Sequence, residues 1–277
     1  MSSPHVSIVM PAWRPRREWL LQAVGSALAQ RDCKLELIVV DDGNDQPVED
    51  LLADVRDPAL RVVRVDHGGS SRARNAGVEA ARGRLIRFVD ADDVYELGST
   101  ARLARLIGDD VAIAYGRTVF CDSELRPVWT MSTQLEGRIA AEAVLGRFRV
   151  RIQSLLFPAS VVRDAGPWDP ALTVCEDLEF IARALEHAPV RPDPHPATWY
   201  RKHAASASAD VAAGDQGIRC VIERYLERHP EQRGTAFERR ALASRHAVAA
   251  RARATRGMAG PALRRLGRSL ALDPREA

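Results

Sequence analysis

The N-terminal third of the chain alternates short apolar segments with amphipathic ones, and this alternation constrains the fold more than any other feature. Four of the apolar segments have the length of buried strands, and the segments between them favour helix. The expected strands cover residues 6–10, 35–40, 60–65 and 85–89, and the expected helices cover residues 17–30, 48–55 and 70–82. Strands that alternate with helices pair in parallel through right-handed crossovers, so the sequence predicts an α/β fold with a mostly parallel sheet flanked by helices.

The middle of the chain is less regular. It predicts a pair of strands, two helices, a proline-rich loop and a last short strand. In that order, these segments cover residues 111–120 and 125–129, 137–145 and 177–187, 189–196, and 197–201. The loop is expected because residues 189–196 hold four prolines, which lack the N–H group that a sheet interior requires.

Beyond about residue 210 the sequence is rich in Ala and Arg and predicts a short all-α extension. Residues 215–277 hold 14 Arg and 7 acidic residues, a net charge of +7 within a chain of net charge +3. A basic tail of this kind is most often a solvated helical surface, and the alternative is a peripheral contact with an anionic membrane. We expect one α/β domain over residues 1–210, a helical extension over residues 211–277, and no nucleic-acid polymer as partner.

The composition indicates a globular protein that stays in the cytoplasm. Hydrophobic residues make up 46% of the chain and charged residues 28%. No apolar run approaches the roughly 20 residues that span a bilayer, and residues 1–5 do not begin a secretory signal. The four cysteines are far apart and form no Cys-x-x-Cys, which argues against a structural zinc site and favours buried, reduced thiols.

Acidic and aromatic side chains follow three of the expected parallel strands. Trp13 follows the first strand, Asp42 the second, and Asp90, Asp92 and Asp93 the fourth. In open α/β sheets, ligands bind outside the carboxyl ends of the strands. Three crowded carboxylates repel one another unless a cation compensates them, so the sequence predicts a shared site that includes a divalent metal.

Three further segments are candidates for the same site. Arg74 lies at the start of a helix after Gly68 and Gly69, an arrangement that suits a diphosphate. The pair Glu176 and Asp177 is either an ordinary acidic helix start or a source of a general base. His203 is either an exposed loop residue or a ligand for metal or phosphate. The sequence contains neither a Gly-x-Gly-x-x-Gly after the first strand nor a P-loop.

Taken in order, these motifs resemble the family 2 glycosyltransferases with the Rossmann-like GT-A fold. The match includes Val-Asp-Asp-Gly at residues 40–43, Ala-Arg-Asn-Ala-Gly at 73–77 and Asp-Ala-Asp-Asp at 90–93. It continues with Gly-Pro-Trp-Asp at 166–169, Glu-Asp at 176–177 and a His segment at 200–203. The resemblance covers about residues 4–210. Trp13 and Arg14 stand where the family usually has Tyr-Asn, so the base or its tilt is expected to differ.

The resemblance implies an inverting transferase that uses a nucleotide-diphosphate-sugar donor and Mn2+ or Mg2+. It implies Asp177 as the general base beside Glu176 as a second catalytic residue. The implied donor-binding residues are Pro11, Trp13, Asp42, Arg74, Asp90 and Asp92, and the implied metal ligands are Asp92, Asp93 and His203. The sequence does not identify the acceptor, which is expected to be a hydroxyl of a lipid-linked, protein or small molecule. The loop at 189–196, or the one after His203, would close over the donor.

Two alternatives remain open at this stage. A sugar nucleotidyltransferase also combines an α/β sheet with metal-binding carboxylates, but it would carry a Gly-rich segment after the first strand, where this chain has Pro-Ala-Trp-Arg-Pro. A non-catalytic binding or scaffold module would use the same fold without transferring a sugar. The intact acidic motifs favour the transferase over both.

Overall fold

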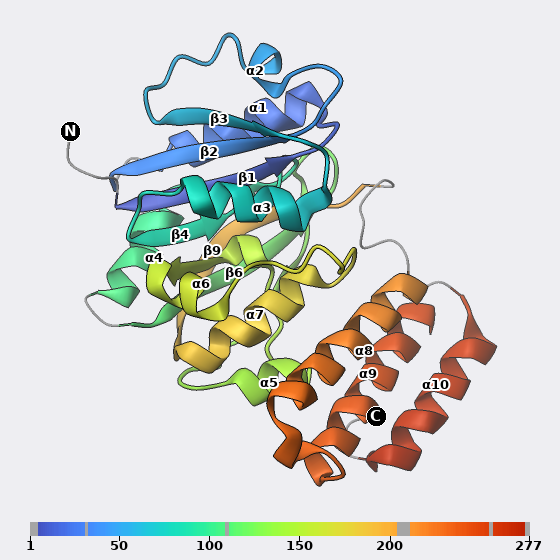
Figure 1. Cartoon of the computed structure of the whole chain (residues 1–277). Helices are drawn as coiled ribbons and strands as arrows, with labels where there is room; N and C mark the ends of the chain where they lie inside the picture. Colours follow the sequence, from blue (N-terminus) through green and yellow to red (C-terminus); the bar gives the residue numbers. More distant parts are fainter. Residues whose placement is uncertain (1–4, 31–32, 109–110, 204–210, 255–256, 275–277) are drawn as a thin grey trace. The chain divides into compact units, whose positions relative to one another are not determined.

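The computed structural model describes residues 5–30, 33–108, 111–203, 211–254 and 257–274. It divides into two compact units (Figure 1). The first comprises Met1–Arg138, Val150–Thr173 and Ala184–His203, and the second comprises Ile139–Arg149, Val174–Arg183 and Ala204–Ala277. The expected domain boundary at residue 210 lies among residues 204–210, outside the described residues.

The described residues of the first unit form one nine-stranded sheet in the order β3-β2-β1-β4-β8-β6-β9-β5, with β7 paired to β6. The strands are β1 (Val6–Ala12), β2 (Leu35–Asp42), β3 (Leu60–Val65), β4 (Leu85–Phe88), β5 (Val94–Tyr95), β6 (Ile113–Cys121), β7 (Pro127–Met131), β8 (Leu155–Pro158) and β9 (Val190–Arg201). The helices around them are α1 (Arg17–Leu28), α2 (Val48–Leu51), α3 (Gly69–Ala80), α4 (Ser99–Ile107), the 3-10 turn η1 (Ile152–Ser154) and α6 (Ala159–Ala165).

The first four strands pair in parallel, as the sequence predicts. β1 lies between β2 and β4, and β3 pairs with β2. Both faces are covered: Ile8 of β1 belongs to the core cluster that includes Leu20 of α1, while on α3 a side chain at Gly77 would meet Val9 and Val40. This two-sided burial explains why β1 and β2 are apolar without alternation. Pro11 lies within β1 rather than closing it.

The rest of the sheet is mixed. β8 runs antiparallel to both β4 and β6, and β6 pairs antiparallel with β7 and parallel with β9. The predicted strand pair at 111–120 and 125–129 corresponds to β6 and β7. The parallel expectation therefore holds for the N-terminal strands, while the later strands pair in both directions.

The prediction of a loop at residues 189–196 is wrong, because this segment is the first part of β9. Ile113 of β6 donates its N–H to the carbonyl of Pro189, so the backbone groups of the odd-numbered residues at the start of β9 point toward β6. At Pro192 and Pro194 the absent N–H would point to the other edge of β9, away from β6. On that edge β5 pairs with Thr198 and Trp199, further along the strand. Prolines are tolerated on such an edge. The segment is consequently no lid over a donor, and the loop after His203 lies outside the described residues.

The second unit is helical. It contains α5 (Ala140–Val144), the first part of α7 (Glu176–His187), α8 (Val211–Arg228), α9 (Ala236–Ala254) and α10 (Ala259–Leu272). Its core gathers apolar side chains from α5, α7, α8 and α9, among them Val144, Ala182, Val221, Leu226 and Ala241. None of the helices in the described part of the chain is long and apolar enough to cross a membrane.

Candidate active site

Asp41 organises the turn after β2. Its carboxylate is buried and accepts hydrogen bonds from the backbone N–H of Asn44 (2.9 Å) and of Val48 (3.0 Å), and from Arg64 (2.9 Å). Burial alone would raise the pKa of Asp41, but these hydrogen bonds outweigh it and lower the pKa. The side-chain amide of Asn44 also donates to the carbonyl of Ala12 (2.8 Å), which fixes the end of β1. Asp41 is therefore a structural residue of the site.

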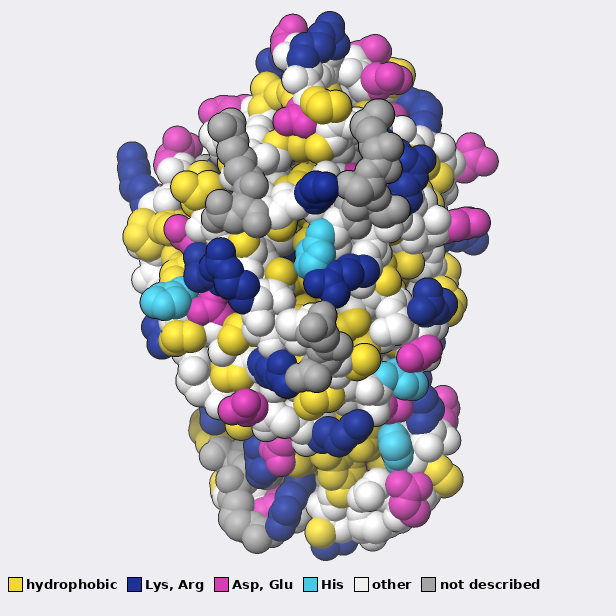
Figure 2. Space-filling model, turned by 90° about the vertical axis from the view of Figure 1, so that its left-hand side faces the viewer, with side chains coloured by type: hydrophobic (Ala, Val, Ile, Leu, Met, Phe, Trp, Pro, Cys, Tyr) yellow, Lys and Arg dark blue, Asp and Glu magenta, His cyan; other side chains and the backbone are white. Residues whose placement is uncertain are grey.

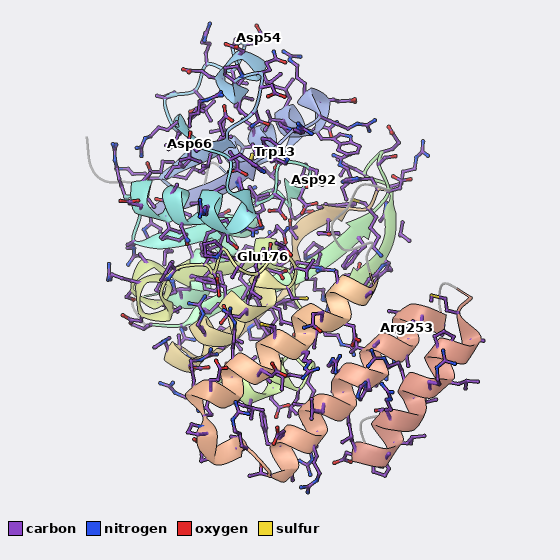
Figure 3. The ribbon with its side chains drawn as sticks, turned by 45° about the vertical axis from the view of Figure 1, so that its right-hand side comes forward. Trp13, Asp54, Asp66, Asp92, Glu176 and Arg253 are labelled. Atoms are coloured by element: carbon purple, nitrogen blue, oxygen red, sulfur yellow. The ribbon has the colours of Figure 1, made fainter. Side chains whose placement is uncertain are left out.

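Asp42 and Trp13 lie together through His67. The Asp42 carboxylate is buried and accepts the backbone N–H groups of Gly68 (2.8 Å) and Gly69 (3.0 Å), and it contacts Nδ1 of His67 (2.9 Å). The His67 ring stacks on the indole of Trp13, with centroids 3.7 Å apart and planes 19° apart. Trp13, labelled in Figure 3, is 40% exposed, so part of its indole remains open to a planar group.

The turn after β4 places three carboxylates in different environments. Asp90 accepts hydrogen bonds from Nη2 of Arg74 (2.8 Å) and Nε2 of Gln153 (2.6 Å). Asp93 is 1% exposed and accepts from the backbone N–H of Arg201 (2.8 Å) and from Nε2 of Gln153 (2.9 Å). Asp92 is the carboxylate of the turn that contacts a histidine.

Asp92 faces His203, the last described residue before the gap at 204–210. Oδ2 of Asp92 lies 2.8 Å from Nε2 of His203. The imidazole ring also packs on Trp19 of α1, with ring centroids 4.8 Å apart. The Arg201 guanidinium carbon lies 5.0 Å from the centroid of the same Trp19 ring. These contacts explain how a residue distant in sequence reaches the acidic turn.

The acidic turn favours a cation. Burial, followed by the neighbouring charge of Asp90, raises the pKa of Asp92. Burial, followed by the charges of Asp92 and Asp90, raises the pKa of Asp93 well above its ordinary value. Each shift means that the ionised carboxylate is held at a free-energy cost, which a bound cation would reduce.

Arg74 and Asn75 connect α3 to the rest of the site. The Arg74 guanidinium is buried, and its carbon lies 4.6 Å from the centroid of the Trp168 ring while Nη2 holds Asp90. The Asn75 side chain donates to the carbonyl of Trp168 (2.9 Å) and accepts its N–H (2.8 Å). Two of the motifs quoted above, at residues 73–77 and 166–169, are thus joined by direct contacts.

Glu176 and Asp177 belong to the second unit. They occupy the first turn of α7 and are half-buried. The preceding residue, Cys175, has a φ of 58°, and its side chain contacts α8, where Gly217 leaves room for it. The backbone N–H of Leu178 donates to Oδ1 of Asp177 (2.8 Å), which leaves Oδ2 as the second acceptor atom.

The structure brings most of the predicted residues of the first unit to one edge of the sheet. Trp13 and Asp42 follow or end neighbouring parallel strands, and the turn at 90–93 follows the next strand in the same direction. His67 and Gln153 were missed by the sequence reasoning. His67 directly precedes the glycine pair 68–69, which was a usable signal, whereas nothing in the sequence around Gln153 marks it.

Comparison with known proteins identifies the family. The model described as "Glycosyl transferase family 2" matches residues 7–159. The chain belongs to glycosyl transferase family 2. The predicted resemblance and the predicted enzyme class are thereby confirmed at the level of the family.

The relatives are longer than this glycosyl transferase family 2 chain. The succinoglycan biosynthesis protein ExoO of Rhizobium meliloti is 30% identical over 199 residues, which are 66% of this chain and 56% of that protein. An uncharacterized glycosyltransferase of Rickettsia felis is 31% identical over 237 residues, 83% of this chain and 39% of the relative. The chain thus spans about half of one relative and less of the other.

A solved structure supports the fold. The crystal structure of residues 1–349 of TarS from S. aureus, in complex with UDP-GlcNAc, has a TM-score of 0.64 at 16% identity. It covers 97% of this chain and 90% of that one. This likeness confirms the predicted α/β fold of GT-A type.

Proposed function

We propose that this family 2 chain transfers a sugar from a nucleotide-diphosphate-sugar donor to an acceptor hydroxyl, with inversion at the anomeric carbon. The observation that supports this most strongly is the shared edge of the parallel sheet. There the ends of β1, β2 and β4 place an exposed aromatic pair and four carboxylates, those of Asp42, Asp90, Asp92 and Asp93, at the same edge of the sheet.

The aromatic pair would hold the nucleobase. Trp13 offers a ring that is 40% exposed, and Asp42 offers a buried acceptor beside it. Pro11 lies in β1, two residues before Trp13. Bases stack on aromatic side chains at about 1–3 kcal/mol each. TarS, whose fold this chain shares, has been solved with UDP-GlcNAc and with UDP, which supports a nucleoside diphosphate as the carrier.

Arg74, Asp90 and Asp92 would bind the ribose and diphosphate. Arg74 lies in the first turns of α3, whose N-terminal N–H groups favour anions. Its guanidinium already holds Asp90 (2.8 Å), so it sets the position of that carboxylate as well as the local charge. Asp90 is partly exposed and retains access to a hydroxyl group.

The residues of the acidic turn fit a divalent cation, Mn2+ or Mg2+. Asp92 and His203 supply an oxygen and a nitrogen 2.8 Å apart, and burial, followed by the charge of Asp90, raises the pKa of Asp92. No cluster of three or more His, Cys, Asp or Glu suited to a metal occurs within the described ranges. A site of one or two side chains completed by substrate phosphates is typical of these ions.

Asp93, which the resemblance implies as a metal ligand, would instead hold the acidic turn in place, because both its oxygens accept hydrogen bonds inside the protein. When bound, the cation would neutralise the charge that develops on the departing diphosphate. Arg201 and Gln153 hold Asp93 in place and are therefore positioning residues of the proposed site.

Asp177 would act as the general base, with Glu176 beside it. The acceptor oxygen would form the new bond to the anomeric carbon as the bond to the diphosphate oxygen breaks. Its proton would pass to the carboxylate of Asp177. A single displacement from the opposite face inverts the configuration of that carbon. Since a curated relative takes part in succinoglycan biosynthesis, we propose a saccharide or glycoconjugate as acceptor, lipid-linked, protein-bound or free.

The test separates donor binding from transfer. Donor binding is first measured by thermal shift with a panel of nucleoside diphosphates and nucleotide-sugars, each with and without Mn2+, because a ligand that binds only the folded state raises its stability. Asp177→Asn should then keep the donor-dependent shift and lose about 100- to 10,000-fold in transfer rate. Asp164→Asn, an exposed acid of α6, is the matched control.

Two results would contradict the proposal. Transfer by Asp177→Asn at the wild-type rate would remove Asp177 as the base. The absence of any shift with every donor, together with the absence of donor hydrolysis in Mn2+, would indicate a non-catalytic module.

A further inference from the structure

Three aromatic side chains lie in a row across β7, β6 and β9. Phe120, near the C-terminal end of β6, is in register with Trp129 of β7 on one side and with Tyr200 of β9 on the other. Phe120 is 1% exposed, and its ring stacks on the Trp129 indole, with centroids 4.1 Å apart and planes 4° apart. The Tyr200 ring centroid lies 5.1 Å from that of Phe120. Trp129 is 44% exposed, so part of its indole is open to a ligand.

Two cations surround the buried ring of this row. The Arg151 guanidinium carbon lies 5.6 Å from the centroid of Phe120 and 4.9 Å from that of Tyr200, and the Lys202 ammonium lies 5.2 Å from that of Phe120. Within the described part of the chain, neither cation forms an ion pair, and Nε of Arg151 is buried without a hydrogen-bond partner. We name these five residues, Phe120, Trp129, Arg151, Tyr200 and Lys202, the aromatic–cation cluster.

The charge of the cluster favours an anionic ligand. Its two cations have rings rather than carboxylates as neighbours, so the positive charge is left without a compensating ion. Figure 2, by contrast, shows a face of the molecule on which cationic, acidic and apolar side chains are mixed.

The aromatic–cation cluster borders the acidic turn at residues 90–93. β8 runs antiparallel to both β4 and β6, so β4 and β6 run in the same direction and end at the same edge of the sheet. β9 pairs in parallel with β6 and ends there too. The backbone N–H of Arg201 and the side-chain amide of Gln153 both donate to Asp93 of the turn, at 2.8 and 2.9 Å. Each of these donors lies within two residues of a member of the cluster in the sequence.

The strand order places the cluster beyond the acidic turn. The sheet runs β2-β1-β4-β8-β6-β9, so Trp13, which follows β1, and the cluster lie on opposite sides of the turn along this edge. A donor with its base at Trp13 and its diphosphate at the turn would present its sugar toward β6. In an inverting displacement the acceptor attacks from the side opposite the leaving diphosphate, which is the side of the cluster.

We infer that the aromatic–cation cluster binds the acceptor, and that the acceptor is a saccharide with an anionic group. The C–H face of a pyranose ring would pack on Trp129, and Arg151 and Lys202 would hold a carboxylate or phosphate beside that ring. This inference rests on the proposed transfer function and specifies its acceptor.

The test measures the binding of three probes to the full chain by saturation-transfer NMR titration. Methyl β-glucoside, methyl β-glucuronide and glucose 6-phosphate share a pyranose ring and differ mainly in the neutral, carboxylate or phosphate group that it carries. The wild type should bind at least one anionic probe about 5-fold or more tightly than the glucoside. The tighter of the two anionic probes identifies the source of the charge, an acidic sugar or a sugar phosphate.

Two sets of variants separate the ring from the charges. Trp129→Ala should weaken the binding of all three probes about 5-fold, and Trp129→Phe should restore most of the affinity. Lys202→Gln with Arg151→Gln should abolish the preference for the anionic probes and leave the affinity for the glucoside unchanged. A merely structural role of these residues would not alter that preference.

Matched controls come from the same hairpin and from α4. Val128→Ala replaces the neighbour of Trp129, which is 67% exposed and points to the other face of β7. Arg105→Gln removes an exposed cation of α4. Both controls should bind the probes as the wild type does, and every variant should keep the circular dichroism spectrum of the wild type.

The inference would be overturned if the wild type bound none of the probes or bound all three equally, or if Trp129→Ala bound them as tightly as the wild type. The donor-dependent thermal shift in Mn2+, measured on the same samples, keeps this inference apart from the proposed transfer. A donor shift without saccharide binding would refute the acceptor site alone. Saccharide binding that depends on Trp129, without a shift by any donor, would refute the transfer and leave a saccharide-binding site.

Discussion

Asn75 offers a decisive test of whether the Ala-Arg-Asn-Ala-Gly motif acts on the fold or on the ligand. Its amide makes a two-way contact with the backbone of Trp168, donating to the carbonyl at 2.9 Å and accepting the N–H at 2.8 Å. The indole of Trp168 is 1% exposed, packs edge-on against Phe88 and lies under Arg74. We predict that Asn75→Ala primarily destabilises the fold.

The size of the destabilisation follows from the two backbone groups of Trp168 that the substitution leaves without their partner. An unsatisfied buried polar group costs about 1–3 kcal/mol, and these two are only partly shielded from water, so we take the lower half of that range for each. The free energy of unfolding should fall by about 2–4 kcal/mol, and the thermal midpoint by about 4–16 °C. Asn75→Asp should be at least as destabilising, because it sets a carboxylate oxygen against the Trp168 carbonyl.

The assay is thermal unfolding followed by near-ultraviolet circular dichroism, which reports on buried tryptophan. Gln134→Ala is the control, since the Gln134 side chain is exposed and donates to the carbonyl of the adjacent Thr133. A midpoint for Asn75→Ala within about 1 °C of the wild type, which corresponds to under 0.5 kcal/mol, combined with lost donor binding, would refute the reasoning. Asn75 would then be a ligand contact.

Three further substitutions test other parts of the structure. Gly77→Ala should destabilise by about 1–3 kcal/mol in urea unfolding, because the new Cβ would lie 2.3 Å from Cγ1 of Val9; wild-type stability would show that α3 can shift. Burial would raise the pKa of Glu36, but its hydrogen bonds outweigh this and lower it. Its stabilising contribution is therefore present at neutral pH and is lost as pH falls below the ordinary carboxyl pKa. The stability gap between wild type and Glu36→Gln should narrow on acidification, and a constant gap would contradict this. Gln153→Leu removes the amide that donates to Asp90 and Asp93. It should weaken Mn2+-dependent donor binding measured by calorimetry. An unchanged donor affinity would show that Gln153 does not contribute to the site.

Predictions from sequence succeeded where the local pattern and the final environment agree. β1, β2 and β4 were found because burial makes them mostly apolar runs bounded by polar turns, and the edge strand β3 was found from its β-branched valines. Trp13 and Asp42 were found because the carboxyl ends of parallel strands meet at one edge. The helices α1 and α3 were placed within about two residues of their ends because their apolar residues recur with helical spacing.

Predictions failed where a partner distant in sequence decides the outcome. The segment at 189–196 looks like a loop because prolines cannot donate, yet β6 needs only the groups of the odd-numbered residues there. Gln153 could not be found, because its role depends on η1 meeting the turn after β4, 60 residues away in sequence from Asp93. His67 gains its role by stacking on Trp13, which no spacing in the sequence encodes.

The sequence by itself determined the family, the α/β class and the acidic and aromatic residues of the candidate site, because these depend on the order and local periodicity of residues. Only the tertiary structure decided which carboxylates are structural and which are available. Asp41, Asp42 and Asp93 are buried, and their carboxylates accept hydrogen bonds within the protein. The Asp92 side chain, although its Oδ2 contacts His203, is 35% exposed. Neighbouring acids in one motif read alike in sequence, and only the donors and the burial around each oxygen separate their roles.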